Sequence, residues 1–215
     1  MIREYDYYLF DADGTLFDTT EMICSCFEHT AEQFGKQYDK KLVKTHIGMT
    51  LRKQMEIYYG PLTDQMFETF RTAHMDYQLS IYKDFLVLCP GVKEALSELV
   101  QNGKKCAVVT SRMMYTLELF LKEMGIFSFF EVLVTPESTL KHKPDPQPAL
   151  KALELFGSVT PQKAVFIGDS PFDIECGHRA GMDTAFVKWS HNDKSLLSVK
   201  PVYYLNDMRQ LCENS

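Results

Sequence analysis

The stretch Phe-Asp-Ala-Asp-Gly-Thr at residues 10–15 decides how the rest of the chain is interpreted. It overlaps the end of the apolar run 7–10, which predicts a short buried strand. Asp11 and Asp13 therefore come directly after a strand, where Gly14 lets the backbone turn sharply. Two carboxylates so close together repel each other. The pattern therefore favours a site for a hard divalent cation, which binds oxygen ligands, and an acidic turn without a ligand is the alternative.

Composition limits the classes of protein to which the chain can belong. Its 215 residues, 45% hydrophobic and 24% charged, are typical of one large globular domain or a core with a smaller insert. The formal net charge of −6 argues against a general binder of nucleic acids or anionic membranes. No apolar run is long enough to span a membrane and no signal peptide is evident, so we expect a cytoplasmic protein. Six cysteines without a Cys-x-x-Cys pair are expected to be buried free thiols.

Residues 17–84 predict an insert made only of helices. Apolar residues recur in it at helical spacing, and Gly48 interrupts the pattern near its middle. The expected helices lie at about 18–34, 39–45, 51–59 and 64–82. Because no strand is predicted in this block, we expect a core domain of residues 1–16 and 85–215 with a helical domain, residues 17–84, inserted into it.

From residue 85 onward, helices alternate with short apolar strands. The expected strands lie at 105–109, 130–134, 164–167 and 184–187, and a last helix is expected after Asn206. This alternation is typical of the α/β class, in which a doubly wound, Rossmann-like parallel sheet has helices on both faces. Ligands of such sheets bind beyond the carboxyl ends of the strands.

Reactive side chains follow four of the predicted strands. They are Asp11 and Asp13, then Thr110 and Ser111, then Lys143, and finally Asp169 and Asp173. The aspartates offer only oxygen, which suits Mg²⁺. Thr110 and Ser111 precede a helix start, whose N–H groups bind anions, and Lys143 is restricted by neighbouring prolines. A helix cap and an ordinary surface lysine are the alternatives for these positions.

The order of these groups resembles that of the haloacid dehalogenase superfamily of hydrolases. The four matching motifs are Phe-Asp11-x-Asp13-Gly-Thr15, Val-Val-Thr110-Ser111, Lys143-Pro and Gly-Asp169-Ser-x-x-Asp173. A helical insert directly after the first motif resembles the C1 cap subclass. The patterns Lys-Pro-Asp-Pro and Gly-Asp-Ser-Pro-Phe-Asp-Ile are most similar to those of phosphoglycolate phosphatases and their pyrophosphatase and sugar-phosphatase relatives. The chain departs from the pattern at Ala12, where a larger apolar residue is commoner, and at Ser111, where asparagine is frequent.

The resemblance implies a mechanism with two carboxylates in different roles. Asp11 would attack phosphorus and form an aspartyl-phosphate, and Asp13 would act as general acid and then as general base. The implied ligands of Mg²⁺ are Asp11, Asp13 through its backbone carbonyl, Asp169 and Asp173. The implied phosphate-binding residues are Thr110, Ser111 and Lys143, which would meet the charge on the phosphoryl oxygens.

The leaving group must be recognised by the inserted helices, because the strand-end residues contact only the phosphoryl group. Residues 46–53 are the candidate segment, with Gly48 and Arg52 as the expected substrate contacts. Arg52 could bind a carboxylate or a second phosphate. A solvated helix face that carries Arg52 and Lys53 is the alternative.

Several functions remain compatible with the residues. The first is a Mg²⁺-dependent phosphatase acting on a small phosphate monoester, of the phosphoglycolate type. A pyrophosphatase, or a phosphosugar mutase or phosphatase similar to β-phosphoglucomutase, is the second. The third is a non-catalytic binding protein with the same fold. We expect a small phosphorylated substrate, a monomer or homodimer, and neither nucleic acid nor membrane as partner.

Overall fold

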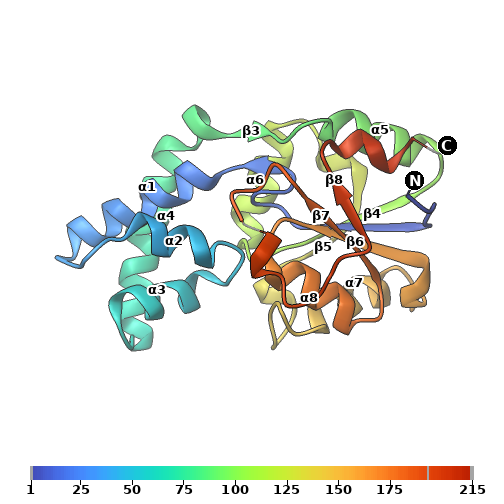
Figure 1. Cartoon of the computed structure of the whole chain (residues 1–215). Coiled ribbons are helices and arrows are strands. Elements are labelled where there is room, and N and C mark those ends of the chain that lie inside the picture. Colours follow the sequence, from blue (N-terminus) through green and yellow to red (C-terminus); the bar gives the residue numbers. More distant parts are fainter. Residues whose placement is uncertain (1, 193, 214–215) are drawn as a thin grey trace.

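The computed structural model describes residues 2–192 and 194–213 of the chain. A parallel sheet of six strands forms the centre of the larger part of the molecule (Figure 1). In their order across the sheet, the strands are β5 (Phe130–Val134), β4 (Lys105–Val109), β1 (Tyr7–Phe10), β6 (Ala164–Gly168), β7 (Asp183–Val187) and β8 (Tyr203–Leu205). Each neighbouring pair is parallel.

This strand order places β1 in the interior of the sheet. The chain adds β4 and β5 on one side of β1 and then continues with β6, β7 and β8 on the other. In such a sheet the connections diverge to opposite faces and leave a crevice at the carboxyl ends of the central strands. The prediction of a Rossmann-like, doubly wound parallel sheet is confirmed.

Helices cover both faces of this sheet. They are α5 (Val92–Gln101), α6 (Met114–Glu123), α7 (Gln147–Leu155) and α8 (Pro171–Arg179). Because side chains alternate along a strand, Phe10 packs on one face with Leu96 and Phe120, whereas Leu9 packs on the other with Leu153. The connections contain the short 3₁₀-helices η1 (Phe127–Phe129), η2 (Pro136–Ser138), η3 (Pro161–Lys163), η4 (Lys194–Leu196) and η5 (Met208–Leu211).

Four helices follow β1 and lie to one side of the sheet (Figure 1). They are α1 (Thr20–Gln33), α2 (Lys40–His46), α3 (Leu51–Tyr59) and α4 (Asp64–Phe85). Each supplies a buried residue to one apolar cluster, in which Phe27, Val43, Met55 and Phe70 take part. The helical face that the sequence predicts as apolar is therefore the face that holds these helices together.

The expectation of no strand in residues 17–84 was wrong at one point. β2 (Phe17–Asp18) pairs with β3 (Val87–Leu88) in an antiparallel ladder of two residues per strand. So short a strand carries no periodicity that a sequence pattern can show. The pair joins the two segments that connect the helices to the sheet. We keep the division into residues 1–16 and 85–215 and an inserted helical domain, residues 17–84, as a proposal.

The C-terminal region also differs from the prediction. The sheet has an additional strand, β8, of only three residues. The helix expected after Asn206 is the single 3₁₀ turn η5, which the side chain of Asp207 caps by accepting a hydrogen bond from the N–H of Arg209. Met208 and Leu211 are both buried, and one turn is enough to place them on the same side.

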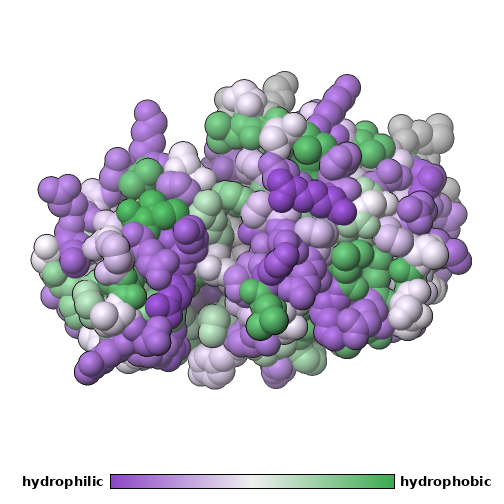
Figure 2. Space-filling model, turned by 90° about the horizontal axis from the view of Figure 1, so that it is seen from below, coloured by the Kyte–Doolittle hydropathy of each residue, from purple (hydrophilic) through white to green (hydrophobic). Residues whose placement is uncertain are grey.

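The remaining expectations concern thiols and surface. All six cysteines are buried and unpaired, as predicted. Among the described residues we find no helix with the length and apolar character that a membrane span requires. The face shown in Figure 2 is mostly hydrophilic, with small, separate hydrophobic patches.

Candidate active site

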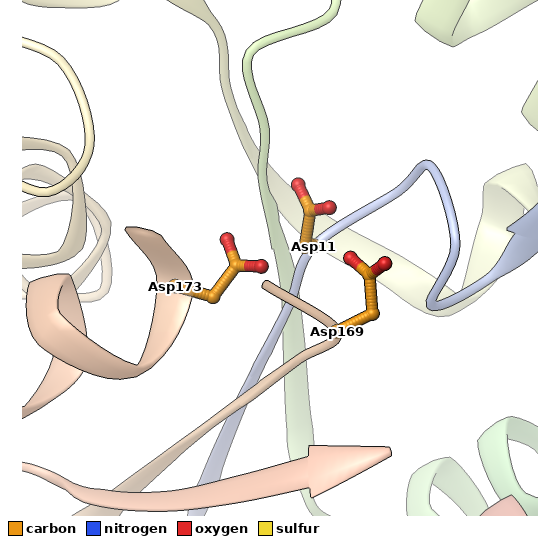
Figure 3. A group of neighbouring side chains, drawn as sticks. All are labelled: Asp11, Asp169 and Asp173. Carbon is orange, nitrogen blue, oxygen red and sulfur yellow. The ribbon is translucent and has the colours of Figure 1, made fainter. Parts of the chain in front are cut away.

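Three buried carboxylates meet at the carboxyl ends of two neighbouring strands (Figure 3). Asp11 follows β1, Asp169 follows β6, and Asp173 lies in the first turn of α8. The parallel pairing of β1 with β6 brings the first two together, and one oxygen from each of the three lies within 4.8 Å of the others. The structure thus brings Asp11 to two carboxylates that lie more than 150 positions later in the sequence.

Glycines and a helix cap fix this cluster. Gly14 has φ of +83°, and a Cβ there would overlap the carboxylate of Asp169. A Cβ at Gly168 would likewise overlap Asp173. Ser170 caps α8, and its N–H and hydroxyl donate to Oδ2 of Asp173 at 3.0 and 2.6 Å. The other oxygen of Asp173 is therefore held towards Asp11.

Lys143 lies between two of the carboxylates. Its Nζ is 2.6 Å from Oδ1 of Asp11 and 2.6 Å from Oδ1 of Asp173, and its side chain is 2% exposed. Burial alone lowers the pKa of Lys143, but the charges of Asp11 and Asp173 raise it above its ordinary value. The cluster thus contains three carboxylates and one ammonium group, which contacts two of them.

This excess of negative charge appears in the pKa values of the cluster. Burial, and then the charge of Asp173, raise the pKa of Asp11 to about 7, although Lys143 acts in the opposite direction. Burial, followed by repulsion from Asp173 and Asp11, raises the pKa of Asp169 well above its usual range. A divalent cation at this point would remove the repulsion.

The donor atoms of the cluster fit such a cation. Oδ1 of Asp169 is buried and has no hydrogen-bond partner among the residues that the structure describes. Its other oxygen accepts hydrogen bonds from Ser190 Oγ at 2.9 Å and from Asn192 Nδ2 at 3.3 Å, which fix the orientation of the carboxylate. An all-oxygen donor set with one open, oriented carboxylate oxygen suits Mg²⁺.

The carboxylate of Asp13 is not part of this cluster and is bonded to other residues. Its Oδ2 accepts a hydrogen bond from Nε of Arg112 at 2.9 Å, and its Oδ1 accepts from Nη2 of Arg112 at 2.5 Å and from Thr19 Oγ1 at 2.6 Å. The guanidinium of Arg112 also lies over the ring of Phe120, and Nη1 donates to Oε1 of Gln78 in α4 at 3.0 Å. Arg112 thus connects the proposed general acid to the inserted helices.

Thr110 and Ser111 lie at the end of β4, beside Asp13. Oγ1 of Thr110 accepts a hydrogen bond from the backbone N–H of Arg112 at 3.1 Å, as a cap would. Oγ of Ser111 donates to the carbonyl of Gly48 at 2.6 Å. Gly48 also lies against Ser170, so the loop between α2 and α3 contacts the core at two points.

A cavity of about 70 Å³ lies between these residues and the inserted helices. Its core side carries Asp11, Asp13, Thr110, Ser111 and Arg112, and its other side carries Ile23, Phe27, Met49, Gln54, His74 and Gln78, among others. Burial, and then the charge of Arg112, lower the pKa of His74 to about 3, so this side is uncharged near neutral pH.

Arg52 lies outside this cavity. Its guanidinium pairs with Glu56 at 3.1 Å and with Asp64 at 2.8 Å. It lines a separate and larger cavity of about 580 Å³, which also contacts Lys53 and His142. The structure therefore brings Gly48 to the carboxylates but does not bring Arg52 there.

Three residues of the site were not predicted from the sequence as site residues. Arg112 directly follows Ser111. A cation directly after a predicted strand was the sequence signal that could have indicated a role for Arg112 in the site. Ser190 and Asn192 follow β7, whose carboxyl end lies at the same edge of the sheet as those of β1 and β6. The predicted strand at 184–187 was therefore the signal for these two residues, which follow its end.

The sheet, the aspartate pair after its central strand and the lysine between carboxylates together define a hydrolase of the haloacid dehalogenase-like class. The model of the haloacid dehalogenase-like hydrolase family matches residues 8–187. The chain belongs to this family, as its motifs predict.

Individual relatives match almost the whole chain. A protein of Caldanaerobacter subterraneus subsp. tengcongensis described as a candidate pyrophosphatase PpaX is 37% identical over 205 residues, covering 94% of this chain and 91% of the relative. Pyrophosphatase PpaX of Bacillus pumilus is 35% identical over 206 residues, covering 94% of this chain and 93% of the relative. The crystal structure of a candidate phosphoglycolate phosphatase from Lactobacillus plantarum has a TM-score of 0.86 at 25% identity, covering 98% of this chain and 99% of that one.

Proposed function

We propose that the protein is a Mg²⁺-dependent phosphatase that hydrolyses a small phosphorylated molecule through an aspartyl-phosphate on Asp11. The observation that carries this proposal is the position of Asp11. It is buried among Asp169, Asp173 and Lys143, and it also lines the cavity that a substrate would enter. A carboxylate with one face towards a cation site and another towards a cavity is placed to act as a nucleophile.

Charge decides which groups must cooperate with Asp11. A carboxylate approaching a phosphoryl group meets Coulomb repulsion, so the site must supply positive charge. The ammonium of Lys143 supplies part of it at 2.6 Å from Asp11. A Mg²⁺ ion held by Asp11, Asp169, Asp173 and the backbone carbonyl of Asp13 would supply the rest by neutralising phosphoryl oxygens.

The other residues at the strand ends have complementary roles in this proposal. Asp13 would protonate the leaving oxygen and later take a proton from the attacking water. Thr110 and Ser111 would donate hydrogen bonds to the phosphoryl oxygens. Both hydroxyls already have partners, because Thr110 caps the following turn and Ser111 binds Gly48. Binding of substrate would therefore exchange the hydrogen bond that Ser111 donates, whereas the hydroxyl of Thr110 only accepts and keeps its proton for a phosphoryl oxygen.

Two relatives support a small anionic substrate, since they are named for pyrophosphate and for phosphoglycolate respectively. Both molecules join the transferred phosphoryl group to a leaving group with a negative charge of its own. We propose this substrate class for the protein, with the inserted helical domain closing over the bound molecule.

The test is a turnover screen with release of inorganic phosphate as the readout. Pyrophosphate, phosphoglycolate, sugar phosphates, nucleotides and p-nitrophenyl phosphate are supplied with Mg²⁺ or with excess chelator. We expect phosphate release that needs Mg²⁺ and is fastest with an anionic leaving group. Transfer of the group to a sugar without release would instead identify a mutase. No turnover of any of them would favour the binding-protein alternative.

A further inference from the structure

Arg112 differs in charge from the other side chains around the cavity. Among the described residues that line it, Arg112 is the one lysine or arginine. The opposite side offers the amides of Gln54 and Gln78, the neutral imidazole of His74 and apolar side chains. Lys143 is already engaged by two carboxylates behind Asp11. A second negative charge on a substrate therefore has Arg112 as its available cation.

The guanidinium of Arg112 is oriented before any ligand arrives. Its side chain is 5% exposed, and Phe120 lies against its flat face at 4.4 Å. Its N–H groups form a fork on Asp13, the geometry in which arginine also binds other carboxylates and phosphates. Because the fork is held by its surroundings, a new oxyanion would bind to it with little loss of side-chain freedom.

The same fork keeps Asp13 away from the reaction. Both oxygens of Asp13 are bonded to Arg112, and one also accepts from Thr19. In the proposed mechanism this carboxyl group must approach the leaving oxygen, so its contact with Arg112 must loosen. An oxyanion entering beside Asp13 would add negative charge to a cavity that already contains two carboxylates. Pairing of the incoming anion with the guanidinium offsets this repulsion and leaves Arg112 with an anionic partner when Asp13 moves.

Building on the proposed function, we propose that Arg112 recognises the leaving group of the substrate. A carboxylate or second phosphoryl group takes the place of the Asp13 carboxylate on the guanidinium, and Asp13 is released towards the leaving oxygen. Arg112 thus selects substrates with a second oxyanion and couples their binding to the position of the general acid. A substrate with an uncharged leaving group leaves Asp13 on Arg112 and is hydrolysed less efficiently.

The kinetic test compares substrates in the variants Arg112→Gln and Arg112→Lys. Values of kcat/KM are measured for pyrophosphate, phosphoglycolate and p-nitrophenyl phosphate. We expect the ratio of either anionic substrate to the aryl phosphate to fall about 10- to 100-fold in Arg112→Gln, as for a lost charge-assisted hydrogen bond. Most of the fall should be in KM. Arg112→Lys keeps the charge but not the fork, and it should restore part of the ratio.

Arg209 is the matched control. Its guanidinium forms the same type of fork on Asp207, through Nε at 2.8 Å and Nη2 at 2.7 Å, but it lies in η5 with a side chain 63% exposed. Arg209→Gln should leave the substrate ratio as it is in the wild type. Equal losses on all substrates in Arg112→Gln would show that Arg112 serves only the fold or Asp13, and would overturn the proposal. A ratio preserved in Arg112→Gln would overturn it as well.

A binding measurement separates this inference from the proposed function. Methylenediphosphonate carries a second anionic group and methylphosphonate does not, and neither needs to be hydrolysed. By calorimetry in the presence of Mg²⁺, we expect the wild type to prefer the first compound and Arg112→Gln to lose about tenfold or more of that preference. If the preference exists and depends on Arg112 in a protein without turnover, the proposed function fails and the inference stands. If the wild type has no such preference, or if Arg112→Gln retains it, the inference is wrong even in an active phosphatase.

Discussion

The two sides of the cavity are built on different principles. The core side consists of charged groups at strand ends, such as Asp11, which is buried and held by Lys143 at 2.6 Å. The inserted helices contribute apolar side chains and neutral amides, such as Phe27 and Gln54. The core side therefore holds the reactive groups in fixed positions. The helical side determines the shape of the cavity above them and excludes water from it.

This difference follows from what each kind of element can hold. Neighbouring parallel strands end at fixed distances from one another, and the backbone around Gly14 and Gly168 leaves no room for other arrangements. The three carboxylates stay close together despite their mutual repulsion, because the surrounding fold holds them in place. Helices packed through one apolar cluster do not provide such an anchor, and they are better suited to move over a substrate.

The largest effect is expected on the core side, from Asp11→Asn. An amide oxygen is a poor nucleophile and a poor metal ligand, so turnover should fall at least ~10³-fold while the fold is kept. The measurement is kcat with the best substrate of the screen, together with thermal unfolding. Asp76→Asn is the control, because Asp76 is exposed on α4. An Asp11→Asn protein that retains more than a tenth of wild-type turnover would show that Asp11 is not the nucleophile.

The second effect concerns the cation that the carboxylates are expected to hold. Mg²⁺ at 100 times its Kd should stabilise the wild type by about 2.7 kcal/mol. Asp169→Asn removes one charge and the open oxygen Oδ1, so we expect it to lose this stabilisation. Without Mg²⁺ it should be at least as stable as the wild type, because burial and repulsion raise the pKa of Asp169.

Chemical denaturation with Mg²⁺, with Ca²⁺ and with chelator measures this effect. Ca²⁺ should support little turnover, since its larger and looser coordination misplaces the attacking oxygen. Activity that persists in excess chelator, or equal stabilisation of Asp169→Asn and the wild type by Mg²⁺, would contradict the assignment.

The comparison of the two sides also explains what could be predicted from the sequence. A residue directly after an apolar strand lies at the carboxyl edge of a parallel sheet, so the sequence places Asp11 and Asp169 together, whereas Lys143 lies nine residues beyond β5 and its place was implied by the resemblance of its motif. The lengths of the strands and of the four inserted helices follow from apolar periodicity in the same way. These features depend on local pattern and on one rule of topology.

The contacts of long side chains could not be predicted in this way. Arg52 and Arg112 look alike in the sequence, and both form ion pairs with carboxylates in the structure. Arg52 meets Glu56 one helical turn away and Asp64 at the start of α4, whereas Arg112 meets Asp13 across 99 residues. Which acid a flexible arginine reaches depends on how the helices pack against the sheet, and periodicity does not contain that information.

A third prediction tests the uncharged nature of the helical side through His74. Thr30 donates its hydroxyl proton to the carbonyl of Cys26, so it accepts a hydrogen bond from Nδ1 of His74, and this places the imidazole proton on Nδ1. Arg112 and His29 are the charged or titratable groups that affect it, and burial is the main reason why its pKa falls to about 3.

The sign of the effect on stability follows from this shift. In the unfolded chain His74 takes up a proton near pH 6.5, whereas in the folded protein it does not until about pH 3. The contribution of His74 to the unfolding free energy should therefore decrease as the pH is lowered from about 6.5 to about 3. His74 should contribute about 1.4 kcal/mol per pH unit to the slope, and the slope in His74→Gln should be smaller than in the wild type by this amount. Urea denaturation from pH 6 to 5 measures it, with His178→Gln, at an exposed position, as control. Equal slopes in the wild type and His74→Gln would show that the imidazole is charged in the cavity.

The smallest effect is expected where the two sides touch, at Gly48. Its φ of +106° is unfavourable for any other residue, and a Cβ there would lie 2.9 Å from Oγ of Ser170 and 3.2 Å from the ring of Phe172. Its carbonyl accepts the hydrogen bond from Ser111. Gly48→Ala should therefore push the loop away from the phosphoryl site and lower kcat/KM a few-fold, which corresponds to about 1 kcal/mol.

Gly60 separates this contact from the backbone strain. It also has a positive φ, +87°, but a Cβ at Gly60 would meet no atom within 4 Å. Gly60→Ala and Gly48→Ala should each lower the unfolding free energy by about 1–3 kcal/mol, because each forces an L-residue to a positive φ. Only Gly48→Ala should lower kcat/KM, since only its Cβ meets the core beside Asp173. If the two variants are equally active, closure of the loop onto Ser170 is not part of turnover, and the helical side is a static wall of the cavity.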